Sequence, residues 1–153
     1  MNQSAKDTIT TLDPFYEAFK GSFTSYMRWP ELDELWMQLK QNQSRQWYIY
    51  AIGEDVPEST ISHIEFCKFI NEINALLIKD HQEEYCGIVY ADSKENPSFI
   101  KIFDPNNLGV SCGFSNNPPL PGWILSTLPP KPLEDKNVLT QQRKRWWQTL
   151  WNK

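Results

Sequence analysis

Apolar residues between positions 60 and 80 recur every three or four residues, which is the spacing of one face of an α-helix. Charged residues fall between them, on the opposite side of the same helix. The apolar set is Phe66, Phe69, Ile70, Ile73, Leu76 and Leu77, and the charged set is Glu65, Lys68, Glu72 and Lys79. This pattern predicts a long helix over about 60–80, beginning near Ser59 or Thr60, with one face packed on a core.

Two shorter helices are predicted before it. The first covers residues 13–27, with Asp13 as its N-cap and Pro14 at its first position, although Gly21 weakens it. The second opens at Pro30 and runs to residue 41. Their helically spaced apolar residues are Phe15, Phe19, Phe23 and Tyr26 in the first, and Leu32, Leu35, Trp36 and Leu39 in the second.

Short apolar segments separated by turns predict strands. "WYIYAI" (47–52) is aromatic and β-branched, as a buried strand is, and residues 84–92 and 98–104 flank a polar turn as antiparallel neighbours would. Further strands are predicted within 108–114 and 122–128, and the prolines around the latter favour a short strand or an edge position.

The order of these elements predicts an α+β fold, because strands come in runs instead of alternating strictly with helices. We expect a mostly antiparallel sheet of three to five strands, with the 60–80 helix packed on one face. An N-terminal helical pair and a C-terminal amphipathic helix complete the fold. Residues 1–12 are predicted to be a flexible leader, 13–130 a single domain, and 131–153 a basic, Trp-rich helix docked on that domain.

Charge is divided unevenly along the chain. Residues 1–130 carry 9 basic against 17 acidic residues, whereas residues 131–153 carry 6 against 2. A net charge of −4 argues against nucleic-acid binding, which needs a basic excess to neutralise phosphates. The polar start, the absence of a run of roughly 18 apolar residues, and three widely spaced cysteines predict a cytoplasmic protein with free thiols.

The stretch "GVSCG" (109–113) matches the G-x-S-x-G pattern of a serine hydrolase, but its surroundings do not. Three prolines within the next eight residues prevent the helix that must follow Ser111, and no histidine follows it in the chain. Glycine at 109 and 113 is better explained by turns. Cys112 is the alternative nucleophile, with His81 as its base if the fold brings them together.

Metal and nucleotide sites are not predicted. His63 and Cys67 stand four residues apart on one helix flank, which suits two zinc ligands, but no further ligands follow at paired spacing. The sequence contains no phosphate-binding glycine loop, so we expect no cofactor. The segment from Asp104 to Asn107 is predicted to be an Asp-Pro turn that binds a ligand or partner, with Asn106 and Asn107 able to adopt left-handed torsions.

The C-terminal helix carries the features most suggestive of binding. Its basic cluster is Arg143, Lys144 and Arg145, and its aromatic residues are Trp146, Trp147 and Trp151. Tryptophan and arginine are common in protein interfaces. Three alternatives stay open: docking of the helix on its own domain, contact with a protein partner or a second copy, and contact with a membrane surface.

These observations favour a non-enzymatic, cytoplasmic protein-binding module, such as an adaptor, a chaperone-like protein or an inhibitor. An acidic body suits a basic client, because complementary charge speeds and selects association. The alternative is a small thiol-dependent enzyme or redox sensor that uses Cys112.

The alternative makes a direct prediction about thiol chemistry. If Cys112 is activated, it reacts with an alkylating reagent at neutral pH much faster than Cys67 or Cys86, because the thiolate is the nucleophile. Peptide mass mapping after brief alkylation measures the three rates. Equal or slower labelling of Cys112 contradicts the sensor hypothesis.

Overall fold

The computed structural model describes residues 13–107, 120–133 and 141–151. Within them, the helices are α2 (Pro14–Phe19), α3 (Trp29–Gln41), α4 (His63–Asp80) and α5 (Gln141–Trp151), with a short 3₁₀ helix η1 (Pro105–Asn107). The strands are β1 (Thr24–Ser25), β2 (Tyr48–Ala51), β3 (Val89–Ala91), β4 (Phe99–Ile102) and β5 (Trp123–Ser126). The prediction of an α+β fold is confirmed. The strand expected within 108–114 lies outside the described residues.

The five strands form one antiparallel sheet in the order β1-β3-β4-β5-β2. The predicted pairing of the strands around the polar turn is confirmed, since Val89 lies opposite Ile102 in β3 and β4. The last strand was expected to be short or at an edge; it is short, with four residues, but it does not lie at an edge. β5 lies between β4 and β2. The flanking prolines lie outside its four residues, so the backbone N–H groups that pair β5 with its neighbours are all present.

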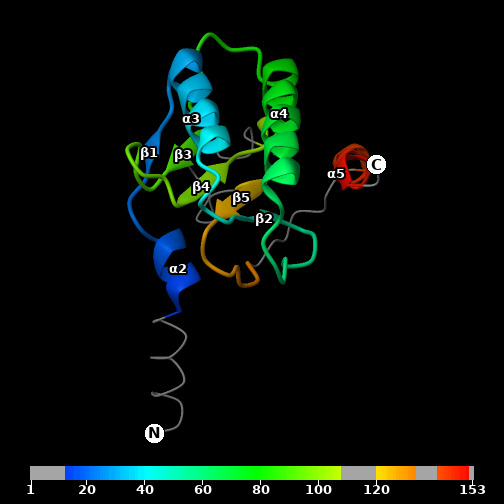
Figure 1. The fold of residues 1–153 in the computed structure, drawn as a ribbon. Helices are drawn as coiled ribbons and strands as arrows, with labels where there is room; N and C mark the ends of the chain where they lie inside the picture. Colours follow the sequence, from blue (N-terminus) through cyan, green and yellow to red (C-terminus); the bar gives the residue numbers. More distant parts are fainter. Residues whose placement is uncertain (1–12, 108–119, 134–140, 152–153) are drawn as a thin grey trace, which may run out of the picture.

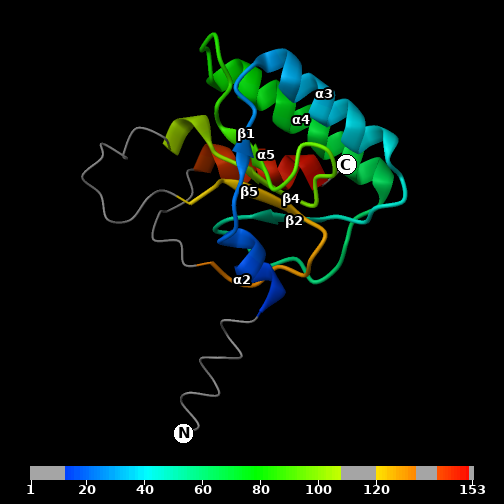
Figure 2. The ribbon, with the colours of Figure 1, turned by 90° about the vertical axis from the view of Figure 1, so that its left-hand side faces the viewer.

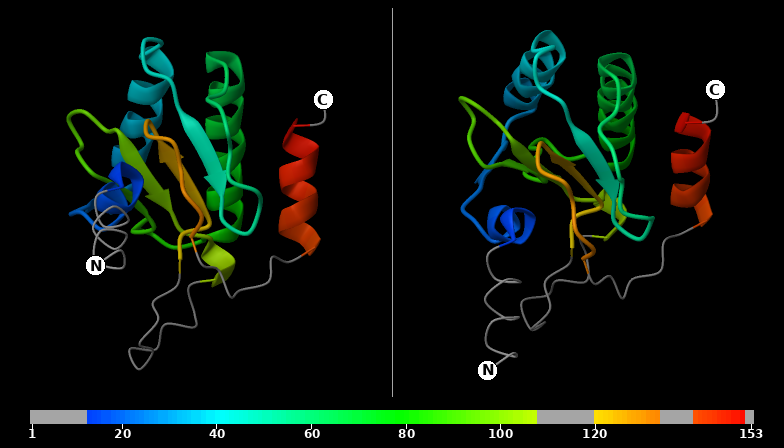
Figure 3. Two further views of the ribbon diagram at one scale, coloured as in Figure 1. Left: turned by 90° about the horizontal axis from the view of Figure 1, so that it is seen from below. Right: turned by 60° about the horizontal axis from the view of Figure 1, so that its bottom comes forward.

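Helices cover both faces of the sheet. Figures 1 and 2 show α3 and α4 side by side over one face and α2 at the other. In both views of Figure 3, α4 lies between α3 and α5. The larger core contains the inward residues of α3 and α4 together with Leu150 of α5, and a smaller core on the opposite face is centred on Phe15, Tyr50, Phe99 and Ile124.

Helix α4 confirms the predicted apolar face, because all six residues assigned to it are buried. It begins at His63, three or four residues later than expected. The Ser62 side chain caps it by accepting a hydrogen bond from the backbone N–H of Glu65 at 3.2 Å. The preceding Ile61 N–H donates to the carbonyl of Trp47 at 3.1 Å, so this residue lies beside the start of β2 and is not helical.

The first predicted helix is only partly correct. Asp13 and Pro14 start α2 as expected, but the helix ends at Phe19 and the chain then forms the edge strand β1. Phe15 and Phe23 do reach the smaller core, whereas Tyr26 is buried in the larger core on the opposite face. The spacing of these aromatic residues predicted a single buried face of one helix. In the structure they are instead divided between the two cores on opposite faces of the sheet.

Lys101 of β4 ties α2 to the sheet. Its Nζ donates a hydrogen bond to the carbonyl oxygen of Phe19 at 2.8 Å and lies 4.1 Å and 4.0 Å from the ring centroids of Phe19 and Phe23. The rings favour a charged amine. Burial nevertheless lowers the pKa of Lys101 to about 8, so keeping this amine charged costs folding free energy.

We expect the free energy of unfolding to rise between pH 8 and pH 9. The folded pKa of Lys101 is about 8 and lies below the ordinary lysine value of 10.5, so the unfolded chain binds more protons in this window and stability increases with pH. Above pH 9 the rise is opposed, because burial raises the pKa of Cys86 above its ordinary 9.0 and, from pH 10, because burial raises the pKa of Tyr26 from 10.0 to about 12. Denaturant titrations at stepped pH measure the change.

The variant Lys101→Met removes this rise, while Lys131→Met, which changes an exposed lysine, retains it. The same rise in both variants contradicts its assignment to Lys101.

Candidate functional site: the dock of the C-terminal helix

Arg143 of α5 is 6% exposed and lies between two carboxylates from distant parts of the chain. Its Nε donates to Oδ2 of Asp104 at 2.8 Å, and its Nη2 donates to Oδ1 of Asp104 at 2.9 Å and to Oδ2 of Asp80 at 2.8 Å. Burial by itself lowers the pKa of Arg143, but the bonds and charges of Asp104 and Asp80 raise it above its ordinary value. The guanidinium is therefore a buried, fully charged anchor.

Local structure explains where the two carboxylates stand. Asp80 is the last residue of α4, and Asp104 immediately precedes η1. The Asp104 side chain is held in a turn because its Oδ1 also accepts a hydrogen bond from the N–H of Asn106 at 2.9 Å. A Cβ atom at Gly122 would lie 3.2 Å from the Cβ of Asp104. The absence of a side chain at Gly122 therefore lets the backbone just before β5 pass close to Asp104.

Aromatic side chains complete the contact between α5 and the domain. The Trp146 ring meets the rings of Trp123 and Phe69 edge-on, with centroid distances of 5.6 Å and 6.4 Å, and the Trp147 ring meets Phe69 at 6.4 Å. Leu150 is buried in the larger core, and Lys68 donates a hydrogen bond to its carbonyl oxygen at 2.5 Å. We call the surface that holds α5 the dock; it comprises Asp80, Asp104, Phe69, Trp123 and Lys68.

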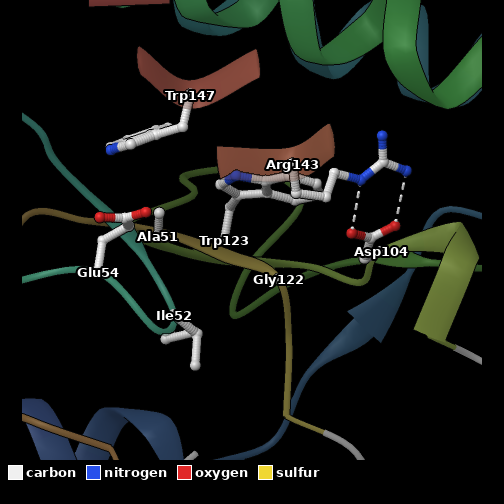
Figure 4. A pocket seen from close by; sticks show the side chains of 8 residues that line it. All are labelled: Ala51, Ile52, Glu54, Asp104, Gly122, Trp123, Arg143 and Trp147. Atoms are coloured by element: carbon white, nitrogen blue, oxygen red, sulfur yellow. Dashed lines mark hydrogen bonds and ion pairs between the residues drawn. The ribbon is translucent and has the colours of Figure 1, made fainter. Parts of the chain in front are cut away.

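A cavity of about 20 Å³ lies beneath α5. Figure 4 shows Arg143 and Asp104 at one side of it, Glu54 and Trp147 at the other, and Trp123 between them. The remaining lining residues are Ala51, Ile52 and Gly122. This volume accommodates about one water molecule. With α5 in place, the cavity is too small for an organic substrate.

The residues that the sequence singled out for binding fall into different environments. Trp146, Trp147 and Trp151 pack, partly buried, against the larger core; Lys144 is partly exposed and Arg145 exposed. Asn106 is exposed, and the side chain of Asn107 lies outside the described residues. Left-handed torsions are not found at these asparagines, since within the described ranges only glycines have positive φ, and η1 forms instead.

The dock unites two predicted sites and adds residues that sequence reasoning missed. Asp104 and Arg143 were selected separately, and the structure joins them in one ion pair. Nothing in the neighbouring sequence marks three of the dock residues as functional, because each fits the pattern of its own helix or strand: Asp80 and Phe69 in α4, and Trp123 in β5. The uneven charge of body and tail was the single hint that a tail cation meets a carboxylate.

Of the thiol and metal candidates, the three that the structure describes, His63, Cys67 and His81, take part in hydrogen bonds within the fold. Cys112 lies outside the described residues, and the Nε2 of His81 donates to the carbonyl oxygen of Cys86 at 2.8 Å. The His63 Nε2 donates to the Lys40 carbonyl at 2.8 Å and lies 3.3 Å from Sγ of Cys67. In the part of the chain that the structure describes, no three histidine, cysteine or acidic side chains gather as a metal site would require.

Comparisons with protein-family models, with curated proteins and with solved structures found no match to this chain. Within the described ranges, none of the helices has the length and apolar character needed to cross a bilayer.

We expect Arg143→Ala to lower the free energy of unfolding by about 3–5 kcal/mol, because it leaves two carboxylates without their buried cation. Chemical denaturation followed by tryptophan fluorescence measures the loss. Arg145→Ala is the matched control: the same substitution two residues away, at an exposed position, changes stability by less than about 0.5 kcal/mol. Equal effects of the two variants contradict the anchoring role of Arg143.

Proposed function

We propose that the protein is a non-enzymatic protein-binding module that holds an extended, basic segment of a partner at the β1 edge of its sheet. The observation that carries the proposal is a pair of large, exposed apolar side chains at that edge. Met27 is 48% exposed and Tyr85 is 55% exposed. A Cβ atom at Gly87 would lie 3.4 Å from the Tyr85 ring and 3.6 Å from the Met27 sulfur, so both side chains flank this glycine.

We call Met27, Tyr85 and Gly87 the edge patch. The backbone around it is ordered by hydrogen bonds, since Cys86 N–H donates to the Met27 carbonyl at 2.7 Å and Gly87 N–H donates to the Tyr26 carbonyl at 2.9 Å. Gly87 has a φ of 69°, a left-handed conformation that side chains disfavour. A preformed apolar surface of this kind favours binding because little ordering is needed when the partner arrives.

The edge patch differs from the other exposed apolar side chains. Met37 is on α3, and Ile64 and Ile78 are at opposite ends of α4. Single exposed apolar residues of this kind are ordinary. At the edge patch two such side chains lie together, beside β1, which stands at one end of the strand order. Open sheet edges accept an added strand from a partner, and nearby apolar side chains then select its sequence.

The two acidic residues on the Tyr85 side of the edge patch favour a basic partner. Glu83 and Glu84 precede Tyr85 and are exposed, and the Glu83 carbonyl accepts a hydrogen bond from Trp29 Nε1 at 3.0 Å, which holds this segment in place. Lysine or arginine next to an apolar residue in the partner would match these charges. A cytoplasmic location is part of the proposal, supported by Cys67 and Cys86, which are both free thiols.

Photo-crosslinking from the edge patch tests this function. A benzophenone amino acid replaces Tyr85 in the protein expressed in its host, and the same replacement at Met37, an equally exposed apolar position on α3, is the matched control. We expect a specific crosslink from position 85, mapped by mass spectrometry to a partner segment that contains lysine or arginine. Reversing the charges of Glu83 and Glu84 to lysine weakens that crosslink.

Crosslinks of equal pattern from positions 85 and 37 contradict the proposed function, as does a crosslink from position 85 that is insensitive to the reversed charges.

A further inference from the structure

We infer that the dock is a helix-exchange site: α5 is its resident ligand, and a partner helix with the same chemistry replaces α5. The partner helix must have an arginine, aromatic residues three and four positions after it, and a leucine seven positions after it. The corresponding residues of α5 are Arg143, Trp146, Trp147 and Leu150. This surface lies apart from the edge patch, so the inference goes beyond the proposed function and does not depend on it.

The first support is the way α5 is buried. Among the α5 side chains that the structure describes, Arg143 and Leu150 are the buried ones, and the three tryptophans keep part of their surface exposed. A buried ion pair is a weaker source of stability than well-packed apolar residues of similar size, but it rejects any segment that lacks the matching charge. The dock is therefore better suited to selecting a helix than to holding one permanently.

The second support is that α5 is a poor helix without its dock. Its described part, Gln141–Trp151, has 11 residues, which is short for an isolated helix in water, and the first turn of that part has no acidic residue. Arg143 and Lys144 are instead close to its N-terminus, where cations oppose the helix dipole. Asp80 and Asp104 provide the missing negative charge at this end. Helix formation by α5 is thus coupled to docking, and the two are lost together.

The third support is the surface that α5 leaves behind. Removing α5 uncovers two carboxylates, which converge on Nη2 of one arginine, together with the rings of Phe69 and Trp123. This combination of paired negative charge and aromatic surface is complementary to an amphipathic basic helix. Because α5 belongs to the same chain, its effective concentration at the dock is high. A competing helix therefore binds most readily when the covalent link between α5 and the domain is cut.

The test uses the full chain with a protease recognition sequence placed between residues 136 and 137. The protein folds intact and is then cut, so that α5 remains in the dock without a covalent link. The probe is a fluorescein-labelled peptide of residues 137–153, followed by fluorescence anisotropy. We expect the labelled peptide to exchange into the cut protein and to bind the uncut protein at least 100-fold more weakly.

Two variant peptides examine the chemistry of the exchange. The Arg143→Ala peptide binds the cut protein at least 100-fold more weakly, because the carboxylates lose their partner, whereas the Arg145→Ala peptide, altered at an exposed position, binds within a few-fold of the original. Equal affinity of the two variants overturns the inference, as does failure of the probe to exchange. Unfolding of the domain on cutting also overturns it, since the domain would then need a covalently linked α5 to stay folded.

Hydrogen exchange on the unaltered protein provides a second, independent measurement. If α5 leaves the dock by local opening, its amides are protected at least 100-fold less than those of α4. Equal protection of α5 and α4 means that α5 opens only with global unfolding, which overturns the inference. Light scattering that finds dimers formed by reciprocal exchange of α5 assigns the dock to a second copy, and this too overturns the assignment to a partner helix.

Discussion

Strand β5 is buried along its whole length, and this burial dictates the layered arrangement of the protein. Trp123 and Leu125 belong to the larger core, while Ile124 between them belongs to the smaller core on the opposite face. A strand with both faces buried needs helices on both sides of its sheet. The chain meets this requirement with α2 on one side and with α3, α4 and α5 on the other (Figure 2).

The position of α5 follows from the same requirement. It covers Trp123 beside α4, and there it places a buried guanidinium next to aromatic rings. A buried guanidinium is tolerated only when its charge and donors are matched, which Asp80 and Asp104 accomplish. The dock lies near the β2 end of the sheet and the edge patch lies at the β1 end, so the two surfaces lie apart.

Local sequence patterns predicted much of the fold. The buried faces of α3 and α4 follow directly from helical periodicity, and the β3–β4 pair follows from two apolar runs around a polar turn. The same logic was wrong for residues 20–27, because aromatic spacing cannot distinguish one helical face from two faces of a sheet. For β5, the flanking prolines correctly indicated a short strand but not its position inside the sheet, since prolines restrict the residues they occupy and not the position of a neighbouring strand.

Outside residues 20–27, the sequence by itself determined where α3, α4 and the strands β2 to β5 lie and which faces of the two helices are apolar, because these properties depend on residues within a few positions of one another. Only the tertiary structure decided that Arg143 meets Asp104, 39 positions away, and Asp80, 63 positions away. It also brought Met27 and Tyr85 to the same glycine. Contacts of this kind depend on how the elements pack around the sheet, and periodicity contains no information about the partner that a side chain meets across the core.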